Sequence, residues 1–95
     1  MMEEIENVIV EDGKIIDPIS EKVLGEVGIV ELSVEMPPEM LGIYRIKSIR
    51  VYDTAETMEF NDQEKVDNQE FFSEEEIKEF LAEAYGILPE CIETV

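Results

Sequence analysis

The side chains that most often carry out catalysis are scarce in this sequence. It contains no histidine, the commonest general base and zinc ligand, so no serine–histidine pair can form. The one cysteine, Cys91, has Glu90 and Glu93 beside it, and their negative charges disfavour a nucleophilic thiolate. The five glycines form no phosphate-binding loop. We therefore predict a protein that is not an enzyme and that holds no cofactor or metal.

Carboxylates are the remaining groups that could do chemistry, and four of them fall within the polar segment 61–70. A calcium-binding loop requires the pattern D-x-D-x-D-G followed by a glutamate, whereas this segment has no glycine and a different spacing. A solvated loop explains the segment better than weak cation binding does. Its acidic side chains are candidates for contact with a partner protein: Asp62, Glu64, Asp67 and Glu70.

A second group of carboxylates is expected on the outer face of a helix. Glu75, Glu79 and Glu83 are spaced by four residues, which places neighbouring side chains about 6 Å apart on one helix face. Like charges at this spacing cost a few tenths of a kcal/mol each. The helix dipole favours acids in the first turn, but Glu79 and Glu83 lie towards the negative end. Either this face is merely solvated, or a partner is contacted by Glu75, Glu76, Glu79 and Glu83.

The residues around this row carry the signals of a docked helix. Ser73 and Glu76 have the spacing of a capping box, and Phe72 and Ile77 have that of a hydrophobic staple. Gly86 is the residue expected just beyond the helix end. An apolar stripe recurs at helical spacing and would pack on a sheet: Ile77, Phe80, Leu81, Ala84 and Tyr85.

Strand patterns precede the helix. Asp12-Gly13 marks a tight turn between strands expected at 5–10 and 14–17. Alternating apolar and polar residues predict a long strand at 27–36, followed by another at 43–52.

The strand at 43–52 changes the parity of its apolar residues near Lys47-Ser48. A β-bulge there would restore one buried face, or else the strand is buried on both faces. Further short strands are possible at 54–60 and 91–95.

These elements predict a single α+β domain over residues 1–95. We expect a mainly antiparallel sheet of four to five strands with one amphipathic helix of the C-terminal half, at 74–85, packed on it. Its core should contain Val30, Leu32, Val34, Ile46, Val51, Ile77, Phe80 and Leu81.

The charge of the chain restricts its partners. It has 25 acidic and 7 basic residues, for a net charge of −18. Such a surface repels nucleic acid and anionic membranes, so neither is expected as a direct partner. Residues 53–95 alone carry fourteen acidic and two basic residues. The basic residues of the strand at 43–52 are expected to pair with acids of the neighbouring strand: Arg45, Lys47 and Arg50 with Glu31 and Glu35.

Two functions fit these features. The first is an acidic inhibitor that mimics nucleic acid and blocks a basic nucleic-acid-binding protein. Small phage-encoded anti-restriction and anti-CRISPR proteins are similar in size and charge. The second is an acidic adaptor or assembly subunit, such as one of a phage particle, whose charge serves solubility.

The same features indicate a cytoplasmic setting, in the host cell if the chain is phage-encoded. A single cysteine allows no internal disulfide. An acidic start replaces the basic start of a secretory signal, and no apolar run approaches the roughly 20 residues that span a bilayer.

Overall fold

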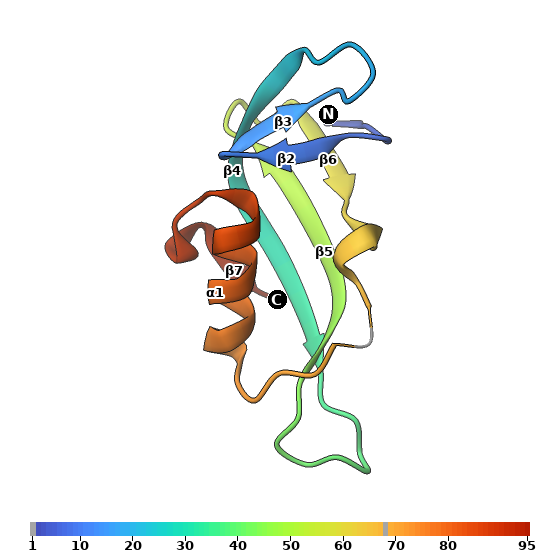
Figure 1. The fold of residues 1–95 in the computed structure, drawn as a ribbon, viewed down its shortest axis with the longest axis vertical. Helices are drawn as coiled ribbons and strands as arrows, with labels where there is room; N and C mark the ends of the chain where they lie inside the picture. The colour runs from blue at the N-terminus through green and yellow to red at the C-terminus, as the bar shows by residue number, and fades with distance from the viewer. Residues whose placement is uncertain (1, 68) are drawn as a thin grey trace.

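The computed structural model describes residues 2–67 and 69–95, and these form one curled sheet with an α-helix packed against it (Figure 1). The predicted α+β class is confirmed. In chain order the elements are β1 (Glu3–Glu4), β2 (Ile9–Glu11), β3 (Lys14–Ile16), β4 (Val23–Glu35), β5 (Arg45–Asp53), β6 (Met58–Asn61), the 3₁₀ helix η1 (Gln63–Lys65), α1 (Glu74–Tyr85), the 3₁₀ helix η2 (Pro89–Cys91) and β7 (Ile92–Thr94).

The sheet has seven strands within the described residues, more than the four or five expected, and it is mixed. Its order is β1-β6-β5-β4-β3-β2, with β7 paired to β4. The pairs from β2 to β6 are antiparallel, whereas β1 lies parallel to β6 and β7 lies parallel to β4. Because β4 is 13 residues long, β3 pairs with its start and β7 with its middle, while β5 runs along the opposite edge.

Two bulges curl the central pair of strands. Ser33 pairs with Ser48 but Val34 pairs with Ile46, so Lys47 is the extra residue and the predicted bulge is confirmed. A second irregularity leaves Gly28 unpaired in β4. A Cβ at Gly28 would lie 3.0 Å from the Asp53 carbonyl oxygen, which explains why a glycine occupies this close approach.

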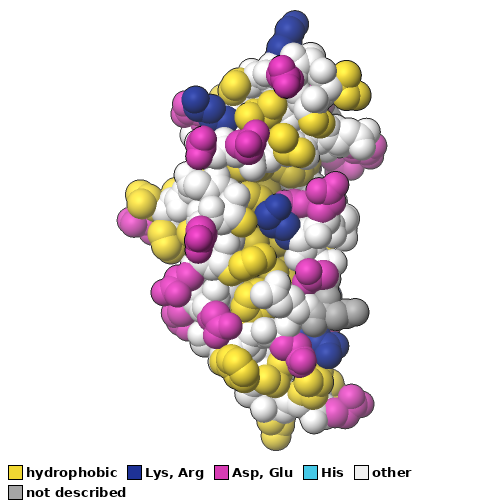
Figure 2. Space-filling model, in the orientation of Figure 1, with side chains coloured by type: hydrophobic (Ala, Val, Ile, Leu, Met, Phe, Trp, Pro, Cys, Tyr) yellow, Lys and Arg dark blue, Asp and Glu magenta, His cyan; other side chains and the backbone are white. Residues whose placement is uncertain are grey.

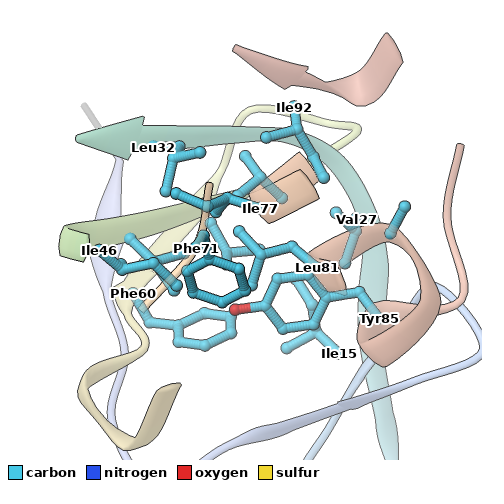
Figure 3. Close-up of a cluster of buried hydrophobic side chains, with 14 residues drawn as sticks. Ile15, Val27, Leu32, Ile46, Phe60, Phe71, Ile77, Leu81, Tyr85 and Ile92 are labelled. Carbon is cyan, nitrogen blue, oxygen red and sulfur yellow. The ribbon is translucent and has the colours of Figure 1, made fainter. Parts of the chain in front are cut away.

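The core lies between the helix and the inner face of the sheet. Figure 3 shows Ile77, Leu81 and Tyr85 of α1 packed among side chains of the strands. Six of the eight predicted core residues are buried: Val30, Leu32, Ile46, Val51, Ile77 and Leu81. The other two, Val34 and Phe80, are half-buried against this cluster, and the Phe80 ring lies 5.5 Å from that of Phe71.

Capping fixes the start of α1 largely as the sequence predicts. The Ser73 hydroxyl accepts a hydrogen bond from the Glu76 N–H at 3.1 Å, and the Glu76 carboxylate accepts one from the Phe72 N–H at 3.3 Å. The staple prediction is wrong, because Phe72 is 71% exposed and Phe71 is the buried residue instead. Phe71 takes this role because its backbone pairs with Tyr44, which directs its side chain into the core.

The end of α1 rests on the predicted turn between β2 and β3. Asp12 and Gly13 both have positive φ, as a type I′ hairpin turn requires. The Gly13 N–H donates to the Tyr85 carbonyl at 2.6 Å, and the Gly13 carbonyl accepts from the Val27 N–H at 2.8 Å. Gly86 ends the helix in the left-handed conformation with φ of 69°. The hairpin turn thus joins the helix to β4.

We expect Gly86→Ala to lower the free energy of unfolding by roughly 2–4 kcal/mol, because it combines a left-handed backbone with overpacking. A Cβ at Gly86 would lie 2.7 Å from the Asp12 Cα. Gly42→Ala is the matched control, since Gly42 has φ of 85° but a Cβ added there would meet no atom within 4 Å; it should cost only about 1 kcal/mol. Urea unfolding of both variants measures the difference. Equal losses would show that the hairpin does not press on the helix end.

Asp53 is a buried charged residue whose side chain accepts hydrogen bonds across the turn between β5 and β6. One carboxylate oxygen accepts from the N–H groups of Thr57 and Met58 at 2.7 and 2.9 Å, and the other accepts from the Thr57 hydroxyl at 2.7 Å. Burial by itself raises the pKa of Asp53, but these hydrogen bonds outweigh burial and the net pKa is lowered. The ionised carboxylate therefore stabilises the fold.

The sign of the shift predicts an acid-dependent loss of stability. The contribution of Asp53 is present above the ordinary pKa of 3.8 and disappears as pH falls through the lower pKa of the folded state. Asp53→Asn should destabilise the protein by a constant amount near neutral pH, and its difference from wild type should shrink as pH falls below about 4. Urea unfolding at a series of pH values measures this difference. A difference that stays constant down to acid pH would contradict the lowered pKa.

Candidate protein-binding surface

The predicted acidic row, which we call the helix row, lies on the solvent side of α1. Glu75, Glu76, Glu79 and Glu83 are all exposed, on the side of the helix opposite its buried residues. Figure 2 shows acidic side chains gathered over the region that α1 occupies in Figure 1. Of these four, Glu76 also has a structural task, since its carboxylate caps the helix start.

The helix row has no ion pair among the described residues. The salt bridges among the described residues join Arg50 to Glu59 at 3.0 Å, Arg50 to Glu4 at 3.9 Å and Lys65 to Asp62 at 3.6 Å. All three lie outside α1. The repulsion between glutamates at i and i+4 therefore acts without a bound cationic side chain to offset it.

The segment 61–70 differs from the solvated loop that the sequence suggests. Asn61 ends β6, and η1 follows after Asp62. The Tyr85 hydroxyl donates to the Asp62 carboxylate at 2.5 Å, and the Lys65 ammonium lies 5.2 Å from the centre of the Tyr85 ring. Only 12% of the Asp62 side chain is exposed. Asp62 therefore joins η1 to the helix, and little of it is open to a partner.

The Tyr85 hydroxyl is held as a neutral donor. Burial, followed by the hydrogen bond to Asp62, raises the pKa of Tyr85 well above its ordinary value. The other three acidic residues predicted in this segment are exposed: Glu64, Asp67 and Glu70. Asp67 also accepts a hydrogen bond from the Gln69 N–H at 2.9 Å.

The two predicted acidic regions lie on different elements, although Tyr85 at the end of α1 contacts Asp62 and Lys65. In Figure 1, η1 and α1 lie on opposite sides of the view with β5 between them. A partner that contacted both would have to span this width. The helix row is the more regular of the two, because one rigid element carries all four of its carboxylates.

A cavity beside η1 adds acidic residues that sequence reasoning missed. It has a volume of about 360 Å³, and Glu4, Glu6, Asp62 and Glu64 line it together with Phe60 and other residues. The parallel pairing of β1 with β6 brings the first two glutamates to this place. No sequence signal indicates this contact, since it joins segments about 55 residues apart. Within residues 2–67 and 69–95, no cluster of three or more potential ligands is arranged to hold a metal.

The basic residues of β5 pair differently from the expectation. Arg50 lies opposite Glu31 in the register but donates a hydrogen bond to Glu59 and forms a longer ion pair with Glu4. The Arg45 guanidinium turns to the Met40 sulfur at 3.6 Å although its register partner is Glu35. Side-chain length explains the difference, because a long arginine reaches past its direct neighbour.

Glu31 bonds to an aromatic hydroxyl instead of a base. The Tyr52 hydroxyl donates to its carboxylate at 2.6 Å on the outer face of the sheet. This hydrogen bond, followed by burial, raises the pKa of Tyr52 to about 12. The outer face therefore carries a second tyrosine–carboxylate pair, which is more exposed than the one made by Tyr85.

The two tyrosines allow a matched test of the contact between Asp62 and α1. Tyr85→Phe should lower the free energy of unfolding by about 1.5–3 kcal/mol, because it removes a hydrogen bond to a charged group that is largely shielded from solvent. Tyr52→Phe removes a similar bond on the outer face and should cost less than about 1 kcal/mol. Thermal and urea unfolding of both variants measure the losses. A greater loss for Tyr52→Phe would contradict the structural role of Asp62.

Comparison with known proteins assigns no family to this surface. No protein-family model matches the chain, and no curated protein or solved structure is significantly similar to it. Among the described residues, no helix combines the length and the apolar character needed to cross a membrane.

Proposed function

We propose that the protein is a non-enzymatic inhibitor that binds a basic, nucleic-acid-binding protein in place of its nucleic acid. The observation that carries this proposal is the row of exposed glutamates on α1, which has no ion pair among the described residues. Each i, i+4 pair costs stability. Glu76 also caps the helix, but Glu75, Glu79 and Glu83 make no such contact among the described residues, so these three are candidates for binding a partner.

The rigidity of α1 supports the proposal. Ser73 caps its start, Gly86 ends it, and its inner face is buried in the core. Carboxylates on such an element keep a fixed spacing, so this protein loses little backbone freedom when a partner binds them. Flexible acidic tails lack this property.

The charge density of the row sets the scale of the mimicry. Successive glutamates at i and i+4 give one charge per about 6 Å of helix, whereas a DNA strand carries one per about 3.4 Å. The row alone is therefore about half as dense as one strand. The net charge of −18 on the whole chain adds a wider negative potential around the row. This potential mainly accelerates association with a basic groove.

The class of protein that fits this description is the small acidic inhibitor, of which phage anti-restriction and anti-CRISPR proteins are examples in size and charge. Such an inhibitor would act in the cytoplasm of the cell that holds its target. It would contact the target with the helix row, and with Glu64, Asp67 and Glu70 where the target is wide enough to reach them.

The test of this proposal compares two triple variants of equal net charge. The first, E75Q/E79Q/E83Q, removes three charges of the row. The second, E11Q/E21Q/E26Q, removes three exposed glutamates of β2, the β3–β4 turn and β4. Binding partners are captured at low salt and identified, and association rates are then measured with nucleic acid as a competitor. The first variant should be slightly more stable than wild type, since like-charge pairs are relieved. It should nevertheless associate about tenfold or more slowly.

The control decides whether position or total charge matters. Equal slowing by both variants would mean that only net charge acts. A partner that binds this protein and its nucleic acid at the same time would contradict the mimicry. Either result would leave an adaptor or assembly subunit as the better description of the protein.

A further inference from the structure

Apolar side chains gather at the end of the molecule formed by the β4–β5 connection (Figures 1 and 2). We call this region the apolar tip and define it by its three exposed large side chains, Met36, Leu41 and Phe72. Leu41 is 83% exposed and Phe72 is 71% exposed. The long axis of the molecule measures 43 Å, and the β3–β4 turn lies at its other end.

Backbone hydrogen bonds hold the two parts of the tip side by side. The N–H groups of Tyr44 and Phe71 each donate to the other residue's carbonyl, at 2.7 and 2.9 Å. This bridge brings the segment before α1 next to the start of β5. Within the β4–β5 connection, the N–H of Met40 donates to Pro37 and that of Ile43 donates to Met40, at 3.0 and 3.1 Å. The connection is therefore a hydrogen-bonded turn.

Core packing does not explain why a large apolar side chain stands at Phe72, which is 71% exposed. Its neighbour Phe71 fills the core and packs against Phe80, so the adjacent ring is left facing solvent. An exposed phenylalanine on a backbone fixed at both sides loses little freedom when it is buried by a partner. Aromatic and methionine side chains are also the types that supply binding energy and adaptability at protein interfaces.

The charges around the tip select its occupant. Exposed acids flank it at Glu35, Glu39 and Glu70, and the nearby Arg45 turns inward to Met40. Lys47 is the exposed base closest in sequence. A second copy of the chain would bring a net charge of −18 against another −18, which opposes self-association. A surface of opposite charge is complementary instead.

We propose that the apolar tip docks into an apolar recess bordered by lysine or arginine on the partner protein. This inference rests on the proposed function, since it assigns to the same basic partner a second contact besides the helix row. The two contacts divide the work: the carboxylates accelerate encounter, and burial of Phe72 and Leu41 slows dissociation.

Two synthetic peptides serve as defined probes for this surface. One is an amphipathic helix of lysine and leucine, and the other has serine in place of every leucine at the same charge. The full chain should bind the first peptide about tenfold or more tightly than the second, because only the first offers apolar surface. The double variant L41S/F72S should lose this preference through faster dissociation, while its melting temperature stays unchanged.

The control is I19S, since Ile19 is 90% exposed but lies in the β3–β4 turn at the other end of the molecule. It should keep the full preference. Equal effects of I19S and L41S/F72S would overturn the proposal. So would concentration-dependent dimerisation in sedimentation that L41S/F72S abolishes, or binding of the tip to neutral phospholipid vesicles.

The helix row is tested beside the tip so that the two proposals fail separately. If E75Q/E79Q/E83Q slows association with both peptides but L41S/F72S has no effect, the tip proposal is wrong and the proposed function stands. If L41S/F72S alone weakens binding, the tip proposal is supported and the helix row has no part in binding.

Discussion

The fold depends on the contact between the end of α1 and the Asp12-Gly13 turn. Tyr85 is the residue at which the parts meet: its carbonyl accepts from Gly13, its ring lies in the core, and its hydroxyl donates to Asp62. Gly13 in turn accepts from Val27 of β4. One residue thus connects the N-terminal hairpin, the 3₁₀ helix η1 and the sheet. A domain of this size has a small core, so contacts between elements such as these contribute much to fixing its structure.

The charge of the molecule is arranged around this junction. Acids that take part in folding are fixed by hydrogen bonds, as Asp53 is by Thr57 and Met58, or Asp62 by Tyr85. Within the part of the chain that the structure describes, the acids of the helix row make no such bonds apart from the cap at Glu76. The distinction matters because Asp53 and Asp62 are largely covered by the structure, whereas Glu75, Glu79 and Glu83 are open to a partner. Sequence alone does not separate the two, since both are glutamates or aspartates in polar segments.

Local features could be predicted from the sequence and non-local ones could not. The helix at 74–85, its caps, the Asp12-Gly13 turn and the bulge at Lys47 all arise from neighbouring residues, and the structure confirms them. The parallel pairs β1–β6 and β4–β7 join segments far apart in the chain, and neither has a turn signal. The burial of Phe71 in place of Phe72 is also a non-local effect, because the pairing of Phe71 with Tyr44 decides which ring faces inward. The anchoring of Asp62 follows from Tyr85, which lies 23 residues away.

The parallel pairing of β7 with β4 also affects how the chain acquires its structure. Val30 and Ile92 are neighbours in the sheet but lie about 60 residues apart in sequence, and such distant pairings make folding slow. The middle of β4 cannot complete its outer edge until residues 92–95 have been synthesised, because Val95 still donates to Leu32. A nascent chain therefore exposes an unfinished strand edge during translation. The net negative charge of residues 1–52 opposes close approach of neighbouring nascent chains, and so works against aggregation at this edge.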